Sequence, residues 1–269
     1  MGKDKGKGRK RRAEPTGIRR SGRARKAVDY AHQERVELFV AGEDDGRPTT
    51  TTSKYNPKPS PAGTSFVSSL TLPDTSGRPR DAHGCLVFHD HPEFRPNLSP
   101  QQMIASGVFG GCYFHPKGGK KGVKYPKGIP ASMLSHKEYP REWFAGLPAA
   151  MYISRRYEIA TNKYKVKAGQ DQAYWEEKGW IHPLDPRGWF QWYTRFFQGR
   201  RTEDDQRQIS RWRGVTGAKG RWKRFLLNKI VNANAALDDT SVSPVVRQTL
   251  LHWAYEVTER DLERHLKGK

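Results

Sequence analysis

The clearest pattern of apolar and polar positions lies in the C-terminal third of the chain. In "DPRGWFQWYTRFFQGRR", residues 185–201, the aromatic residues at 189, 192, 193, 196 and 197 follow the spacing of one helix face. Similar periodicity and boundary residues predict helices over residues 186–198, 203–213 and 221–231, and from Pro244 onward with Ser243 as N-cap. The short connections between them predict one helical subregion over residues 186–267.

A further helix start stands upstream of this region. Ser99, Pro100 and Gln102 have the order of a capping box with proline in the first turn, and Gly107 is typical of a helix end. The Gly- and Lys-rich residues 107–128 then predict a small β or loop ribbon. The predicted fold class is therefore mainly α: an α-rich multi-helical domain with a small β/loop ribbon.

The N-terminal part of the chain lacks both helical and strand periodicity. Residues 1–40 begin with a dense run of like charges and predict a disordered basic arm, and residues 41–80, rich in Thr, Ser and Pro, predict a linker. Folded structure is expected over residues 81–269, as one α-rich domain.

The net charge of the chain indicates what kind of partner it binds. The 269 residues carry a formal net charge of +21, and residues 1–30, with 12 basic and 3 acidic side chains, account for only +9 of it. Such a field attracts polyanions, so nucleic acid is the expected partner. The segment "KGKGRKRR" also indicates nuclear import, and hence an import receptor and a nuclear location, although a merely solubilising or RNA-sticky tail has the same composition.

Composition argues against other environments. No apolar run reaches the roughly 18 to 20 residues that span a bilayer, so a soluble intracellular protein without a membrane partner is expected. Two cysteines are too few for a disulfide framework and suit a reducing compartment.

The periodicity of the helix over 186–198 separates an aromatic face from a polar face. Its rings fit a buried core better than a platform for a base, whereas Arg187, Gln191 and Arg195 occupy another face. Residues 187–229 hold 12 basic and 3 acidic side chains, so this region either contacts phosphates or is a solvated face with internal ion pairs. The predicted nucleic-acid contacts are Arg187, Gln191, Arg195, Arg200, Arg201, Arg207, Arg211, Lys219, Arg221 and Lys223.

The Gly-rich stretch within residues 211–225 precedes a helix, where free amides favour an anion. It lacks the Gly-Lys-Ser/Thr ending of a P-loop, which excludes nucleotide hydrolysis of that type. It loosely resembles a helix-hairpin-helix turn, and DNA glycosylases with that turn carry a downstream aspartate. The resemblance implies Asp238 or Asp239 as catalytic candidates, although both residues also fit an ordinary turn.

The histidines and cysteines include candidate metal ligands. Cys85, His89, Cys112 and His115 are weak candidates for zinc, because only Cys112 and His115 have the two-residue spacing of paired ligands. No metal or other cofactor is therefore expected.

Several motifs resemble those of an uncharacterised family found in eukaryotes and large viruses: "YWEEKGWI", "DPRGWFQWYTRFFQGRR", "DDQRQISRWRG" and "SPVVRQTLLHWAYE". The resemblance covers residues 92–255 and implies no activity, cofactor or catalytic residue. From its residues, the chain is expected to be a nuclear nucleic-acid-binding protein associated with chromatin, with DNA favoured over RNA. The alternatives are a glycosylase-like enzyme acting on a DNA base and a chromatin adaptor that binds only proteins.

Overall fold

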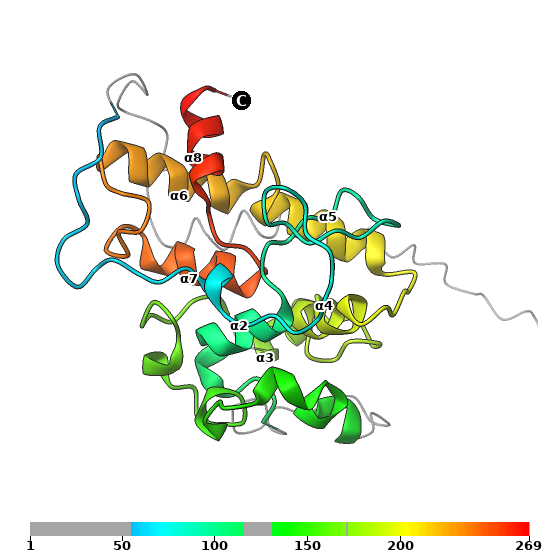
Figure 1. The fold of residues 1–269 in the computed structure, drawn as a ribbon. Helices are drawn as coiled ribbons and strands as arrows, with labels where there is room; N and C mark the ends of the chain where they lie inside the picture. Colours follow the sequence, from blue (N-terminus) through cyan, green and yellow to red (C-terminus); the bar gives the residue numbers. More distant parts are fainter. Residues whose placement is uncertain (1–54, 116–130, 171, 269) are drawn as a thin grey trace, which may run out of the picture.

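The computed structural model describes residues 55–115, 131–170 and 172–268, and this part of the chain is mainly α, as predicted (Figure 1). Its α-helices are α2 (Pro100–Ser106), α3 (Gln172–Glu177), α4 (Trp189–Phe197), α5 (Asp205–Thr216), α6 (Arg221–Asn232), α7 (Pro244–His252) and α8 (Glu259–Leu266). Short 3-10 helices are η2 (Ser69–Thr71), η3 (Phe109–Gly111), η4 (Ala131–Leu134), η5 (His136–Glu138), η6 (Arg141–Phe144), η7 (Ala149–Met151) and η8 (Ile159–Thr161). Strand pairing among these residues is limited to isolated bridges, such as Lys58 with Ala235.

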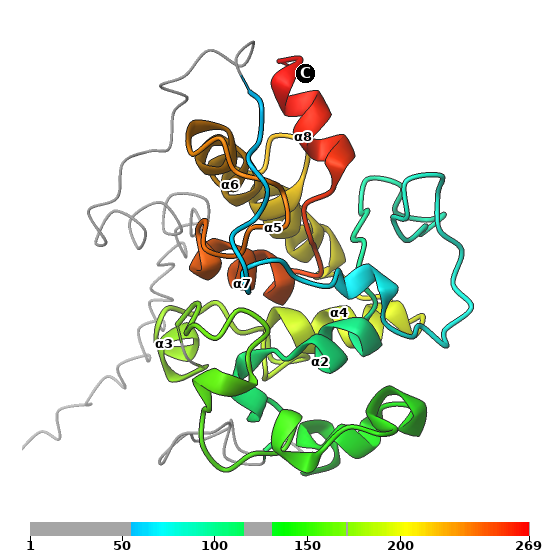
Figure 2. The same ribbon diagram turned by 60° about the vertical axis from the view of Figure 1, so that its left-hand side comes forward.

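The helices form two packed regions. Figure 1 and Figure 2 both show α6, α7 and α8 at one end of the molecule, α2 and α4 in the middle, and the 3-10 helices of residues 131–161 at the other end. One apolar cluster fills the space around α6, α7 and α8, and a larger, mainly aromatic cluster surrounds α4. No helix in the described residues is long and apolar enough to cross a membrane.

Helix α4 lies at the centre of the aromatic cluster. Trp192, Tyr193 and Phe196 are fully buried, and Trp189 and Phe197 are at most 7% exposed. The prediction that these rings form core is confirmed. Burial of such large rings is worth several kcal/mol by area, and it fixes the orientation of α4 in the domain.

Helix α2 begins and ends where the sequence predicts. The Ser99 hydroxyl accepts from the Gln102 amide at 3.3 Å, and the Gln102 side chain accepts from the Ser99 amide at 3.0 Å, which completes the capping box. Gly107 follows with φ of 90°, and a Cβ at this position would lie 2.0 Å from the main-chain oxygen of Thr161. Glycine is thus required there both for the turn and for the close contact.

The chain packs onto the domain well before Asp81. Residues from Tyr55 to Arg80, predicted to be linker, lie along the helical region: Ser69 donates its amide to Glu256 at 2.8 Å, and Arg80 donates to Gln102 at 2.9 Å. Serine, threonine and proline therefore mark an extended strip with specific polar contacts here. The predicted basic arm and the first part of the predicted linker lie outside the described residues.

Three boundaries differ from the sequence-based expectation. The predicted ribbon begins with the 3-10 helix η3, and its residues 116–128 lie outside the described part. Ser243 has left-handed backbone angles (φ 52°, ψ 54°) and makes no capping bond to α7. The helix that begins at Pro244 ends at His252, and α8 is a separate helix with its own capping box between Thr258 and Asp261.

Candidate functional site

The polar face of α4 is buried, as its aromatic face is. Arg187, 2% exposed, donates to the main-chain oxygens of Tyr113 and Leu134, the latter at 2.6 Å. Gln191, 1% exposed, accepts from the Arg187 amide at 2.9 Å and donates to the main-chain oxygen of Met133 at 2.5 Å. These two predicted contacts instead hold the main chain at Tyr113, Met133 and Leu134 against the helix, in an interior that no phosphate backbone reaches.

Arg195, the third residue of that face, is an internal ion-pair centre. Its guanidinium donates to Glu138 at 2.5 and 2.9 Å and to Asp185 at 2.9 Å, and Arg200 contacts the other oxygen of Asp185 at 2.5 Å. Burial lowers the pKa of Arg195, but the hydrogen bond to Glu138 and the neighbouring negative charges outweigh it and leave this pKa raised. The charge of Arg195 is therefore neutralised within the fold.

Two more predicted contacts, at the surface, have acidic partners. Arg201 donates to Asp90 at 2.5 Å and lies over the ring of Phe196, with 3.8 Å between guanidinium carbon and ring centre. Arg207 forms two hydrogen bonds to Asp204, at 2.5 and 2.7 Å. Both guanidinium groups are half-buried, so only part of each remains accessible to an external anion.

Three further predicted contacts are Lys223, which is buried, and Lys219 and Arg221, which lie at an exposed turn. Lys223 is 8% exposed and contacts Asp261 at 3.0 Å, inside the fold. Lys219 and Arg221 are exposed, and neither forms an ion pair with another residue of the described ranges. They lie at the start of α6, where the N-cap residue Gly220 offers no side chain to the first amides of the helix.

The α5–α6 turn has a different register from the helix-hairpin-helix resemblance. Gly214 and Val215 lie inside α5, and the turn consists of residues 217–220. A Cβ on Gly220 would lie 2.6 Å from the main-chain oxygen of Val215, so glycine is required by the tightness of the turn. The turn therefore presents Lys219 and Arg221 without reproducing the Gly-Val-Gly hairpin.

A cavity of about 300 Å³ lies beside this turn, and we call it the aromatic cavity. It is bounded by α3, the N-terminal end of α4, α5, the start of α6 and α7, and five of the eight tryptophans of the chain line it. Its aromatic lining residues are Phe109, Tyr113, Trp175, Trp180, Trp189, Phe190, Trp222, His252 and Trp253. Val245, 48% exposed, and the exposed Gly169 and Gln170 mark its opening to solvent.

The rings of the cavity are held in place by contacts behind them. Trp189 stacks on Tyr193 with centroids 5.1 Å apart and donates its indole N–H to the main-chain oxygen of Gln208 at 3.3 Å. Phe109 stacks on His252 at 4.2 Å with planes 18° apart. These contacts leave the cavity walls little rotational freedom, a property of preformed ligand sites.

The charged groups among the described lining residues have one sign. Arg187 and Arg211 line the cavity, and none of the lining residues that the structure describes is Asp or Glu. The Arg211 guanidinium lies 5.3 Å from the ring centre of Trp253. Burial lowers the pKa of His252 to about 3, so this ring is neutral at neutral pH, and its Nε2 accepts from the Phe109 amide at 3.3 Å. The described lining thus offers ring faces and two positive charges, and it disfavours cationic ligands.

The sequence patterns do not identify this cavity. Their closest signal is the tryptophan density of "YWEEKGWI" and of the α4 segment, which periodicity assigns to core. A ring can belong to the core and also line the cavity: Trp189 packs against Tyr193 and lines the cavity as well. Trp222 and Trp253 join the cavity only through the tertiary arrangement of α5, α6 and α7, which one-dimensional periodicity cannot reveal.

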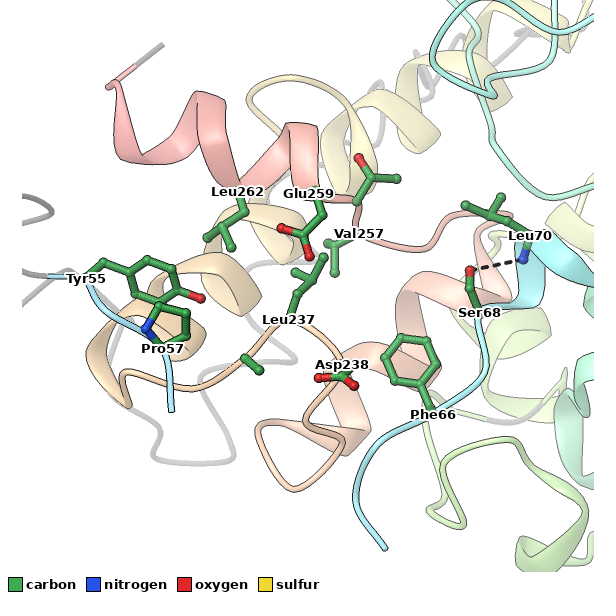
Figure 3. A pocket seen from close by; sticks show the side chains of 12 residues that line it. Tyr55, Pro57, Phe66, Ser68, Leu70, Leu237, Asp238, Val257, Glu259 and Leu262 are labelled. Carbon is green, nitrogen blue, oxygen red and sulfur yellow. Dashed lines mark hydrogen bonds between the residues drawn. The ribbon is translucent and has the colours of Figure 1, made fainter. Parts of the chain in front are cut away.

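The two catalytic candidates lie apart from the aromatic cavity. Asp238 lines a second cavity, of about 430 Å³, between the 55–70 segment and α8 (Figure 3). There its carboxylate accepts from the hydroxyl of Ser60 at 2.5 Å and from that of Ser65, and these hydrogen bonds lower its pKa. Asp239 is 5% exposed and accepts from the amide of Ser241 at 2.9 Å. Neither aspartate is therefore among the lining residues of the aromatic cavity.

The cysteines and histidines also stay separate. No group of three or more His, Cys, Asp or Glu suited to a metal occurs in the part of the chain that the structure describes. Burial raises the pKa of both Cys85 and Cys112 to about 11, so neither thiol is ionised at neutral pH. Cys85, His89, Cys112 and His115 are thus not assembled into a metal site.

Comparisons with known proteins supply no further constraint: no protein-family model, curated protein or solved structure matches the chain significantly.

Proposed function

We propose that this protein binds nucleic acid in the nucleus, with DNA favoured over RNA, and that it contacts the phosphate backbone through the exposed basic turn between α5 and α6. The observation that carries the proposal is the position of Lys219 and Arg221. Both are exposed at the N-terminus of α6, and neither has an acidic partner among the described residues.

The local electrostatics favour an anion at this turn. The first amides of α6 face no capping side chain, and the helix dipole places partial positive charge there. Arg213 and Arg224, also exposed, are neighbours in the chain on either side of the turn. A phosphate would therefore meet both fixed amide dipoles and mobile cationic side chains.

Net charge supports the same assignment and gives the N-terminal arm a role. Outside residues 1–30 the chain still carries +12, from a total of +21. Non-specific attraction by the arm would then add to contacts made by the folded domain. The short basic segment within the arm supports the nuclear location.

The proposal is tested by the salt dependence of binding. In the full chain, Lys219→Ala combined with Arg221→Ala should weaken binding to duplex DNA, measured by fluorescence anisotropy over a range of salt concentrations. Loss of two phosphate contacts should reduce the slope of log K against log salt by about 1.8 in magnitude. A parallel titration with duplex RNA measures the expected preference for DNA.

A matched control removes the same charge elsewhere. Arg264 and Lys267 are exposed on and just after α8, and Arg264→Ala combined with Lys267→Ala should leave the salt slope nearly unchanged. Equal slopes for the turn variant and wild type would refute the proposal. Equal losses in the two double variants would show that net charge, rather than this turn, determines binding.

A further inference from the structure

We propose that the aromatic cavity receives one unpaired base of a single-stranded segment of DNA. The inference rests on the proposed function, because the strand that carries the base is the one held at the α5–α6 turn. Its own basis is the cavity: about 300 Å³ in volume, with five tryptophans in its lining.

Shape favours a flat ligand of limited size. The volume is at the lower end of the range for small-molecule sites, enough for one ring system but not for a base pair within a duplex. Rings enter from several elements: Trp175 from α3, Trp189 from α4 and Trp222 from α6. A base inserted among them would stack on aromatic faces, which is how single-stranded nucleic acids are commonly bound.

Charge selects the same class of ligand. Aromatic cavities also bind quaternary ammonium groups, but Arg187 and Arg211 place two positive charges in this lining, and its described residues include no carboxylate. Nucleobases are neutral rings with carbonyl oxygens and ring nitrogens that accept hydrogen bonds from arginine. His252, neutral because of its burial, adds no charge that would oppose such a ligand.

The cavity and the basic turn belong to one continuous surface along the chain. Trp222 lines the cavity and follows Arg221 directly, and the Arg221 guanidinium lies 6.0 Å from the Trp222 ring centre. Arg211, on α5, lines the cavity and precedes the turn by about two helical turns. Because Arg221 and Trp222 adjoin, one strand can place a phosphate at the turn and a base in the cavity.

The decisive probes are an oligothymidylate and an abasic strand of the same length, which carry the same phosphates with and without bases. The full chain should bind the oligothymidylate about 5- to 150-fold more tightly, the range for stacking of one base. Trp222→Ala should remove most of this ratio, and Trp222→Phe should restore part of it. Equal binding of both strands by wild type would overturn the inference.

A second pair of variants guards against a misfolded tryptophan mutant. Val245→Phe narrows the cavity at an exposed position and should reduce the ratio, whereas Val67→Phe, at a site 76% exposed and outside the cavity, should not. The two proposals fail differently. If neither these strands nor duplex DNA bind, the proposed function is wrong. If duplex DNA binds and the two strands do not, or if both strands bind equally and weaken together in the Lys219→Ala, Arg221→Ala variant, only the base site is wrong.

Discussion

At the scale of single residues, the structure shows why a count of arginines overestimates a binding surface. Arg195 is buried between Glu138 and Asp185, and Arg187 satisfies main-chain oxygens. Sequence spacing correctly separates these residues from the aromatic stripe. It cannot show that Glu138, 57 positions earlier in the chain, closes over the polar face.

Truncation of Arg195 should destabilise the protein. Arg195→Ala leaves the Asp185 carboxylate, which is 1% exposed, with Arg200 as its remaining cationic partner. The truncation also creates a cavity in the interior. We expect a loss of about 3 kcal/mol in the free energy of unfolding, the lower end for a broken buried ion pair. Denaturant unfolding measures it. Asp90→Ala, which breaks a surface pair with Arg201, should cost about 0–1 kcal/mol; equal losses would contradict burial of Arg195.

His252 predicts a pH dependence of stability. Burial lowers its pKa in the folded state to about 3, whereas the ordinary value is 6.5. Between these values the unfolded chain binds the proton that the folded chain excludes. The stability that depends on neutral His252 is therefore fully present above about pH 6.5 and is lost as the pH falls toward 3. For this one group, the free energy of unfolding changes by at most about 1.4 kcal/mol per pH unit. In His252→Gln, unfolding measured from pH 7 to pH 4 should show a slope smaller by up to this amount; an unchanged slope would exclude a buried neutral His252.

At the scale of elements, prediction succeeds where the information is local. The bounds of α2 follow from Ser99, Gln102 and Gly107, all within nine residues of one another, and each makes the expected contact. The cap of α7 fails for a non-local reason. Its preceding loop pairs with the 55–70 segment, for example through Thr240 and Thr64, and Ser243 leaves that loop with φ of 52°. A serine before a proline is thus a start signal only when the preceding chain is free to adopt extended angles.

Sequence patterns miss the aromatic cavity for the same non-local reason. Helix periodicity locates the rings of α4, but the cavity needs α3, α5, α6 and α7 around the N-terminal end of that helix. Trp253 follows the last residue of α7 and packs its ring 4.7 Å from that of Trp189, 64 positions earlier in the chain. The core and the wall of the cavity are therefore continuous here, because Trp189 belongs to both.

At the scale of the whole molecule, the segment before Asp81 contacts distant parts of the chain through one carboxylate. Glu256 accepts from the Ser68 hydroxyl at 3.0 Å and from the Ser69 amide at 2.8 Å. It also pairs with Lys163 at 2.8 Å and accepts from the Tyr164 hydroxyl at 3.1 Å. Glu256 thus links a segment of linker-like composition to distant parts of the chain, in addition to contacts such as that of Arg80 with Gln102.

This arrangement predicts that Glu256→Ala releases the Tyr55–Arg80 segment. The variant leaves Lys163, whose side chain is 12% exposed, without its counter-charge, and we expect a loss of about 3–5 kcal/mol in unfolding free energy. Hydrogen exchange should quicken more at the amides of Ser69 to Leu72 than at those of α6. The Ser69 amide loses its acceptor directly, and the next three amides donate to Ser68 and Ser69, which Glu256 holds in place. Glu259→Ala, which removes an exposed carboxylate, should change neither quantity appreciably. If exchange rose uniformly over the chain, Glu256 would support the domain as a whole rather than anchor this segment.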